Sequence, residues 1–187
     1  MIRDLVLRNR SYRRFHRDKT IELETLREIV DLARLSASAG NRQALKYIIV
    51  NDPQRNSLIF KNIGLAGNPT EEEAPTAYII ILGDKRISNS FGCDQGIAAQ
   101  SILLGASENG IGGCMVGMIN NKELIPTLNI PSHYEILLIL ILGIPKEEVV
   151  IETTFKEGTN MSWVDIEGVR HVPKRLLDDI IVRQDTL

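Results

Sequence analysis

The sequence predicts a fold in which helices surround a buried β-sheet. Three apolar runs, at residues 47–50, 77–82 and 134–142, lack the alternation of a strand with one wet face, so we expect strands covered on both faces. Elsewhere, apolar residues recur every three or four positions, which is typical of amphipathic helices. The 187 residues, 43% hydrophobic and 25% charged, are enough for one folded domain, which we expect to span 1–187.

Two helices are predicted on either side of a basic turn near the N-terminus. A helical pattern of apolar residues starts at Ile2, and a second one continues to Ala33, with Thr20 in position to cap it. The second helix is expected to end in the small-residue loop at 36–41.

The rest of the chain continues this alternation of helices and strands. A polar, helix-like segment at 54–76 separates the first two strands, and we interpret it as a surface excursion. Residues 94–109 leave little polar face, which predicts a buried central helix. A helical turn at 121–128 precedes the third strand, and after Pro145 the chain is expected to be irregular to about residue 170.

Composition argues against several classes of protein. Lys and Arg number 22 against 24 Asp and Glu, and aromatic residues make up 5%, so a broad nucleic-acid surface is not expected. The longest apolar run, 136–144, is far shorter than the roughly 20 residues of a membrane-spanning helix. The N-terminal residues show no signal-peptide core, so we expect a cytoplasmic protein that is not membrane-bound.

The basic turn is the first segment that could bind a ligand. It concentrates six cations against the single acid Asp18: Arg8, Arg10, Arg13, Arg14, Arg17 and Lys19. Guanidinium groups donate paired hydrogen bonds to phosphate oxygens, so a small anion is one interpretation. A solvated charged face and contact with nucleic acid are the alternatives.

Two further segments carry groups able to contact a flat polar ligand. Ser38, Asn41 and Gln43 offer hydroxyl and amide groups, although such residues also form ordinary loops and caps. Residues 110–113 are rich in glycine, but they follow a helix and not a strand, so they do not match a dinucleotide fingerprint. Their glycines either let a ligand approach the backbone or simply form a tight turn. The three histidines are isolated in sequence, and no metal-binding motif is found.

Taken in order, these segments resemble the FMN-dependent nitroreductase family. The resemblance covers nearly the whole chain and rests on the order and spacing of individually weak motifs. These are Arg-Ser-x-Arg-Arg-Phe at 10–15, Ser-Ala-Gly-Asn-x-Gln at 38–43, Asp-x-Gly-x-Ala-x-Gln at 94–100, Gly-Ile-Gly-Gly-Cys-x-x-Gly at 110–117, Leu-Gly-x-Pro at 142–145 and Val-Pro-Lys-Arg at 172–175.

The resemblance implies an α+β fold with a central, mostly antiparallel sheet flanked by helices. It also implies a homodimer with FMN at the subunit interface. The implied activity is a ping-pong reduction in which NADH or NADPH reduces FMN and is replaced by a small-molecule acceptor, nitroaromatic or quinone-like. Chemistry of this kind is carried by the flavin, so no catalytic side chain is expected.

Individual site residues follow from the same resemblance. Arg10 and Ser11 match contacts to the FMN phosphate and ribityl chain, and Arg13 matches the cation near the pyrimidine edge of the flavin. Ser38, Asn41 and Gln43 match a loop that reaches the flavin from the partner subunit. Gly112 and Gly113 match the backbone near the reactive face, and Lys174 with Arg175 match a C-terminal phosphate clamp. Asn9 stands where many relatives have Arg, so Arg10 or Arg14 is expected to supply the missing charge.

Other functions of the same fold remain open alternatives. One is a flavoprotein with a dedicated substrate, for example in reductive dehalogenation or flavin destruction, and segment 54–76 would discriminate it. Another is an FMN-binding or storage protein without turnover.

Overall fold

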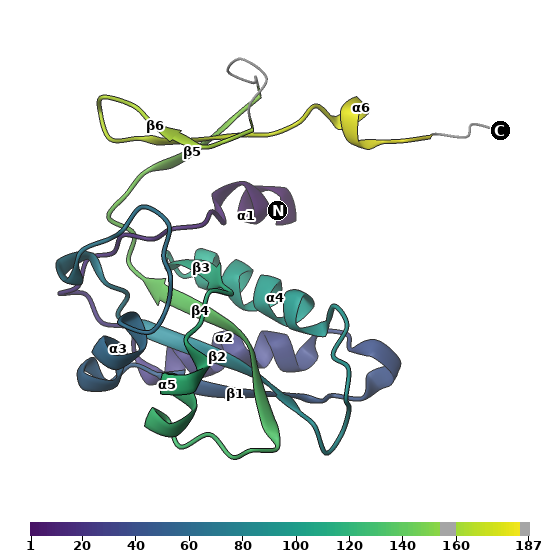
Figure 1. Cartoon of the computed structure of the whole chain (residues 1–187). Coiled ribbons are helices and arrows are strands. Elements are labelled where there is room, and N and C mark those ends of the chain that lie inside the picture. Colours follow the sequence, from purple (N-terminus) through teal and green to yellow (C-terminus); the bar gives the residue numbers. More distant parts are fainter. Residues whose placement is uncertain (154–159, 184–187) are drawn as a thin grey trace. The chain divides into compact units, whose positions relative to one another are not determined.

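The structure is a computed structural model that describes residues 1–153 and 160–183 (Figure 1). It divides into two compact units, Met1–Lys146 and Glu147–Leu187. The expectation of a single domain over 1–187 stays a prediction. Among the residues that the structure describes, no helix has the length and hydrophobicity needed to cross a membrane.

The first unit is built on a four-stranded antiparallel sheet. Its strands lie in the order β1 (Leu45–Val50), β2 (Ala77–Asp84), β4 (Tyr134–Gly143) and β3 (Gly112–Val116). Every residue of β2 is buried. This explains why its sequence is apolar without alternation, and it confirms the predicted strands covered on both faces.

Strand β3 corrects one expectation from the sequence. We interpreted residues 110–117 as a glycine-rich turn or loop, but from Gly112 onward they pair with β4 at the edge of the sheet. The glycines are required by close packing. A Cβ on Gly112 would lie 2.5 Å from Cγ of Pro145 and 2.7 Å from Cδ2 of Tyr12. Glycine in a strand often marks such a close approach of neighbouring groups.

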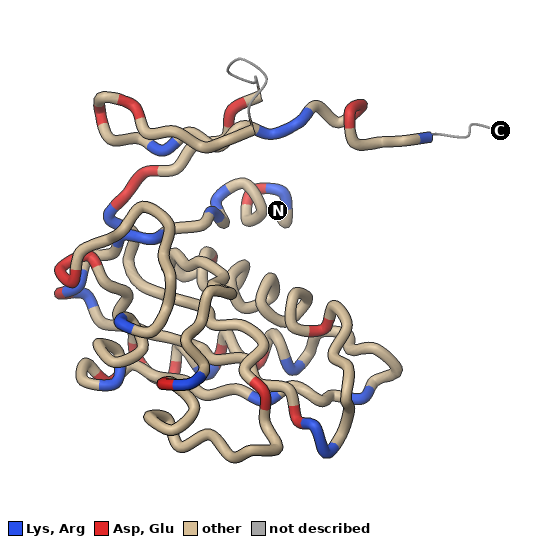
Figure 2. Tube along the Cα trace, in the orientation of Figure 1, with Lys and Arg blue, Asp and Glu red and all other residues tan. Residues whose placement is uncertain are grey.

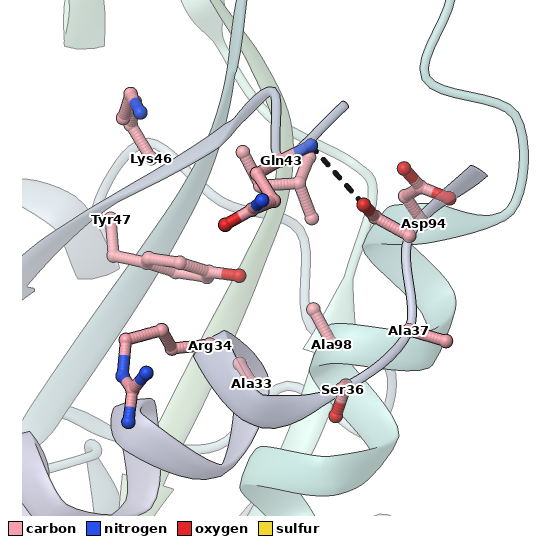
Figure 3. A pocket seen from close by; sticks show the side chains of 11 residues that line it. Ala33, Arg34, Ser36, Ala37, Gln43, Lys46, Tyr47, Asp94 and Ala98 are labelled. Atoms are coloured by element: carbon pink, nitrogen blue, oxygen red, sulfur yellow. Dashed lines mark hydrogen bonds between the residues drawn. The ribbon is translucent and has the colours of Figure 1, made fainter. Parts of the chain in front are cut away.

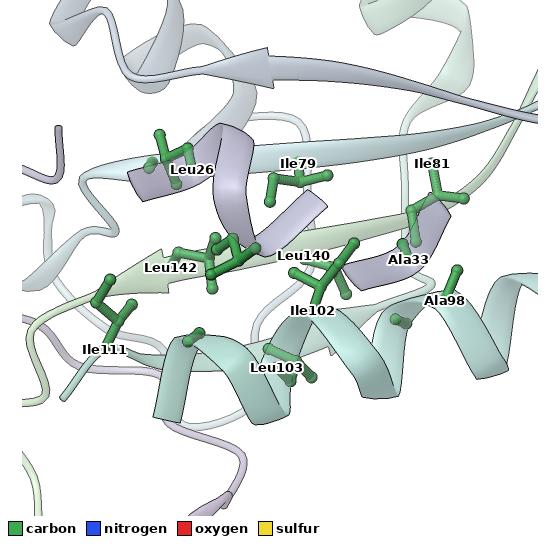
Figure 4. Close-up of a cluster of buried hydrophobic side chains, with 14 of the residues drawn as sticks. Leu26, Ala33, Ile79, Ile81, Ala98, Ile102, Leu103, Ile111, Leu140 and Leu142 are labelled. Atoms are coloured by element: carbon green, nitrogen blue, oxygen red, sulfur yellow. The ribbon is translucent and has the colours of Figure 1, made fainter. Parts of the chain in front are cut away.

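Two helices cover one face of the sheet. Helix α2 (Leu23–Leu35) and helix α4 (Asp94–Glu108) enclose an apolar core with the odd-numbered residues of β2 (Figure 4). Helix α1 (Ile2–Arg8) packs on α4. The prediction of a buried central helix at 94–109 is confirmed. The predicted cap was wrong, because Glu22 and not Thr20 occupies the N-cap position of α2.

The other face is covered by shorter elements. Phe15 from the N-terminal segment, α3 (Pro53–Phe60) and α5 (Asn121–Thr127) pack there against the even-numbered residues of β2. Asp52 caps α3 by accepting the N–H of Arg55 at 2.9 Å. The predicted excursion at 54–76 thus begins in a true helix, and it ends in the 3-10 turn η2 (Glu71–Glu73).

The second unit contains strands where an irregular chain was expected. Strand β7 (Arg170–Pro173) lies between β5 (Val149–Glu152), which is parallel to it, and β6 (Trp163–Val164), which is antiparallel. A short helix, α6 (Leu177–Ile180), follows. These strands have two to four residues each, too few for a hydrophobic period to be recognised.

Candidate functional site

The N-terminal turn lies on the start of β3. Ser11 forms a parallel bridge with Gly113, and the Tyr12 N–H donates to the Gly113 carbonyl at 3.0 Å. One guanidinium nitrogen of Arg13, Nη1, donates to the Ser11 carbonyl at 3.2 Å. The structure therefore brings together the predicted site residues of the turn and of the glycine-rich strand.

Arg10 holds an open hydrogen-bond donor in this turn. Its Nη2 donates to the Val6 carbonyl, but its Nε is buried and finds no partner in the described part of the chain. Burial lowers the pKa of Arg10, against an opposing effect of Tyr12. A buried donor without an acceptor is costly and rare in folded proteins. An anion at this position would supply the missing acceptor.

Arg14 and Arg17 of the basic turn contact a different part of the molecule. Arg14 forms an ion pair with Glu73, and its Nη2 donates to the Gly67 carbonyl at 2.8 Å. Arg17 donates to the Glu71 carbonyl at 2.9 Å. The arginines are thus divided between two sites, because Arg14 and Arg17 bind the segment before β2.

The second predicted group of residues forms one compact loop after α2. The Gln43 N–H donates to Oγ of Ser38 at 3.1 Å, drawn as the dashed line in Figure 3. Asn41 and Gln43 both have positive φ, of 52° and 51°, beside Gly40 at 58°. Left-handed backbone costs a residue such as glutamine about 1 kcal/mol or more and often accompanies a functional constraint. The loop leaves the side chains of Asn41 and Gln43 exposed.

Asp94 positions this loop and was not among the predicted site residues. Its Oδ1 accepts the Ala39 N–H at 3.0 Å, and the residue is buried. Burial, followed by the charge of Asp94, raises the pKa of Tyr47 to about 12. The sequence signal was an acidic residue at the start of a predicted helix, which we had assigned only to the family motif.

A cavity of about 180 Å³ opens beside the loop (Figure 3). Its polar lining includes Ser38, Gln43, Tyr47 and Asp94, with Ala33 and other small side chains making up much of the rest. The cavity can accept part of a flat ligand with polar edges.

The turn and the loop lie at opposite ends of the sheet. Gly113 pairs with Leu142, which in turn pairs with Ala77 at the start of β2. The loop leads into Leu45, which pairs with Gly83 six residues further along β2. At about 3.3 Å per residue the two ends are about 20 Å apart. Helix α4 spans the same distance, with the loop at its first residue and β3 after its last (Figure 1).

Lys174 and Arg175 belong to the second unit. The Lys174 N–H donates to the Glu152 carbonyl at 2.9 Å, so the pairing of β5 with β7 extends to this residue. Both side chains are exposed. Their contribution to a phosphate clamp stays a prediction.

The sequence of the first unit matches a family model. The model of the Nitroreductase family matches residues 6–66 and 61–144. The chain belongs to the Nitroreductase family. The matched residues include the turn, the loop and the glycine-rich strand, but not Lys174 and Arg175. Proteins of this family are oxidoreductases that typically use a flavin, so the chain is assigned to that class of enzyme.

Individual relatives support this membership. A protein of Archaeoglobus fulgidus, described as a candidate NADH dehydrogenase/NAD(P)H nitroreductase, is 29% identical over 146 residues, which are 72% of this chain and 80% of the relative. A nitroreductase family protein of Streptococcus pneumoniae TIGR4 has the same fold at 15% identity, with a TM-score of 0.75 over 98% of this chain and all of that one. An FMN-dependent nitroreductase of Clostridium difficile R20291 aligns with a TM-score of 0.67 at 25% identity, covering 84% and 92% of the two chains.

Proposed function

We propose that this nitroreductase family member is a homodimeric, FMN-dependent oxidoreductase. It takes a hydride from NADH or NADPH and reduces nitroaromatic or quinone-like acceptors in a ping-pong cycle in the cytoplasm. The observation that carries the proposal is the separation of two incomplete binding sites by the length of α4. Each of them presents groups suited to a different part of one flavin nucleotide.

The residues of the turn fit the phosphate and the ribityl chain of FMN. Arg10 has a buried Nε without an acceptor in the described residues, and the next residue, Ser11, is exposed. Charge-assisted hydrogen bonds from guanidinium to phosphate are among the strongest in proteins. Arg14 is committed to Glu73, so we assign the phosphate contact to Arg10.

The loop fits the opposite side of the flavin. Its cavity of about 180 Å³ is smaller than the roughly 300–1,000 Å³ of pockets that enclose a whole small-molecule ligand. Ser38, Asn41 and Gln43 would therefore contact only one edge of the ring system. The rest of the site must come from another surface.

A second copy of the chain supplies that surface. If two copies of α4 pack antiparallel, the loop at the start of one helix meets the turn at the end of the other. Apolar side chains on α1, α2 and α4 are exposed, with exposed fractions of 66% for Ile2, 65% for Leu35 and 38% for Ile97. Apolar surface of this kind is typical of protein interfaces.

The bound FMN supplies the electron and hydride transfer, and the protein positions it. Arg13 would hold positive charge near the pyrimidine edge, where reduction places negative charge. We assign Gly112 and Gly113 to the reactive face of the flavin through their backbone groups alone, because Pro145, Tyr12 and Leu103 fill the space where their side chains would lie. None of these roles requires a side chain to form a bond with the substrate.

The experiment that tests the proposal is an absorbance spectrum of the purified protein with its size in solution. We expect a flavin absorbance band that bleaches on anaerobic addition of NADH or NADPH and returns on addition of a quinone. In size-exclusion chromatography we expect the flavin to elute with a protein of the size of a dimer. A band that does not bleach with either donor would favour a storage protein. If the purified protein contains no flavin and does not bind added FMN, the proposal is rejected.

A further inference from the structure

Arg14 binds the surface segment 62–73, which precedes β2, to the N-terminal segment that carries the proposed flavin contacts. Its guanidinium contacts Glu73 and also donates to the Gly67 carbonyl at 2.8 Å. Oε2 of Glu73 accepts in addition the Thr70 N–H at 3.1 Å. Arg14 thus connects two parts of segment 62–73: the turn at Gly67, and Glu73 near the start of β2.

Neighbouring contacts strengthen the same attachment. The Phe15 N–H donates to the Glu73 carbonyl at 3.0 Å, and Arg17 donates to the Glu71 carbonyl at 2.9 Å. Figure 2 shows the acidic turn η2 beside basic residues of the N-terminal segment. The end of segment 62–73 is therefore attached to the N-terminal segment by a backbone hydrogen bond, by the hydrogen bond from Arg17 and by the ion pair of Arg14.

The beginning of the segment is attached to the far end of β3. Ile63 forms a bridge with Ile119, and the Gly64 N–H donates to the Met118 carbonyl at 2.8 Å. Segment 62–73 therefore runs from the chain just after β3 to the N-terminal segment. Its outer turn is exposed, and Gly67 and Asn68 adopt positive φ there, of 84° and 43°.

This path places the segment next to the proposed flavin site. Ser11 lies on Gly113, and Arg14 follows Ser11 by three residues, which span at most about 10 Å of extended chain. Neither Arg14 nor Glu73 takes part in the pairing of Ser11 with Gly113. Arg14 and Glu73 lie close to this pairing, so the segment that they hold can restrict which acceptors reach the flavin ring.

We propose that Arg14 is a positioning residue for acceptor choice, which it exerts by holding segment 62–73 through Glu73 and Gly67 as one wall of the acceptor site. This inference rests on the proposed function. An acceptor must lie flat on the flavin beside β3, and a fixed wall there restricts the size of the ring that fits. A released wall would admit larger rings and would hold small ones less firmly.

The charge state of the pair supports a permanent attachment near neutral pH. Burial of Glu73 opposes ionisation, but the Thr70 N–H, Arg14 and Lys146 outweigh it, so the pKa of Glu73 lies below its ordinary value. The Glu73 side chain is 16% exposed and that of Arg14 is 33% exposed. Such a partly buried pair is screened less by salt than an exposed one.

The test compares Glu73→Gln with Glu72→Gln. Glu72 is an exposed neighbour in the same turn, so this control removes the same charge without touching Arg14. Steady-state kcat and KM are measured with benzoquinone and with the larger menadione, and anaerobic flavin reduction by the nicotinamide donor is measured separately. Tryptic cleavage after Lys61 reports the attachment of the segment without any cofactor.

In Glu73→Gln we expect the ratio of kcat/KM for menadione to kcat/KM for benzoquinone to rise about fivefold, the lower end of typical coupling between two sites. The change should lie mainly in KM. Cleavage after Lys61 should accelerate, while flavin content and the rate of flavin reduction stay within about twofold of the parent, a difference of less than about 0.5 kcal/mol. Glu72→Gln should match the parent in all four measurements.

Faster cleavage with an unchanged acceptor ratio would overturn the role of Arg14 in specificity. An equal loss of rate with both acceptors and of flavin reduction would also overturn it, because that pattern is a general structural defect. If the parent protein holds no flavin, the proposed function fails, and this inference with it. Arg14→Lys provides a second variant: lysine keeps the charge but cannot bridge two acceptors in a plane, so the ratio should rise by less than in Glu73→Gln.

Discussion

Ser11 and Gly113 pair through their main chains, and this pairing holds the basic turn against the edge strand of the sheet. Gly113 is also closely packed against neighbours in the first unit. A Cβ there would lie 2.6 Å from Cδ2 of Leu103 and 2.7 Å from the Ile141 carbonyl oxygen. Neither neighbour can move away easily, since Leu103 is buried in the core and Ile141 belongs to β4.

Gly113→Ala should therefore destabilise the first unit. Forcing a methyl group into packed surroundings typically costs about 1–3 kcal/mol. The free energy of unfolding in urea measures the effect, and Gly117→Ala is the control because nothing lies within 4 Å of its added Cβ. Equal stability of the two variants would contradict the close packing of Gly113.

Arg10→Ala should weaken FMN binding about tenfold or more. The lost interaction is a charge-assisted hydrogen bond of about 1.5–3 kcal/mol, and 1.4 kcal/mol corresponds to a factor of ten. Fluorescence titration of the apoprotein with FMN measures the dissociation constant. Arg3→Ala removes an equal charge from an exposed position on α1 and should leave it unchanged. Equal affinity in both variants would mean that Arg10 does not contact the phosphate.

The different partners of Arg10 and Arg14 could not be predicted from the sequence. Anion binding was one interpretation of the basic turn, and Arg14 was placed with Arg10 as a source of phosphate charge. Its partner Glu73 lies 59 residues away, and no local pattern connects them. Long-range ion pairs of this kind depend on the folded path of the chain, so spacing along the sequence could not separate Arg14 from Arg10.

Elements with a strong hydrophobic signal were predicted within a few residues. Helix α4 was expected at 94–109 because it has almost no polar face, and it spans Asp94–Glu108. Strand β3 was missed because its two leading glycines favour turns and have low strand propensity. The strands of the second unit were missed because each has only two to four residues, too few for a hydrophobic period to be recognised.

Changing Lys174 and Arg175 together to Ala should lower FMN affinity if the C-terminal clamp forms. Two exposed cations that contact a phosphate would contribute through charge-assisted hydrogen bonds, and we expect a loss of about tenfold. The same titration applies, with the pair Arg3→Ala and Lys122→Ala as a control of equal charge on exposed sites. If both double variants bind FMN equally well, the clamp does not contact the cofactor.

His171 links the three strands of the second unit and should make their packing depend on pH. Its Nδ1 lies 2.6 Å from Oε1 of Glu152 and its Nε2 lies 2.9 Å from Oδ2 of Asp165, while its ring stacks on Trp163 at 5.0 Å between centroids. The hydrogen bonds to Asp165 and then to Glu152 raise the pKa of His171 above its ordinary value of about 6.5. The hydrogen bond to His171 is the main cause that lowers the pKa of Asp165.

His171 and Asp165 stabilise the second unit in different pH ranges. A raised pKa of His171 in the folded state means that its contribution to stability is complete below about pH 6.5 and is lost as the pH rises through the folded value. The lowered pKa of Asp165 means that its contribution is present above its ordinary range and is lost in acid. Packing around His171 should therefore be most stable between these two ranges.

Trp163 is the single tryptophan of the chain, so its fluorescence reports unfolding of the second unit alone. We expect the urea midpoint followed at Trp163 to fall as the pH rises from about 6 to about 9, the range in which a histidine of raised pKa loses its proton. His171→Gln cannot be protonated and should remove this slope while leaving the acid side dependent on the carboxylates. A slope that persists unchanged in His171→Gln would show that another group titrates, and that His171 does not hold β5, β6 and β7 together through its charge.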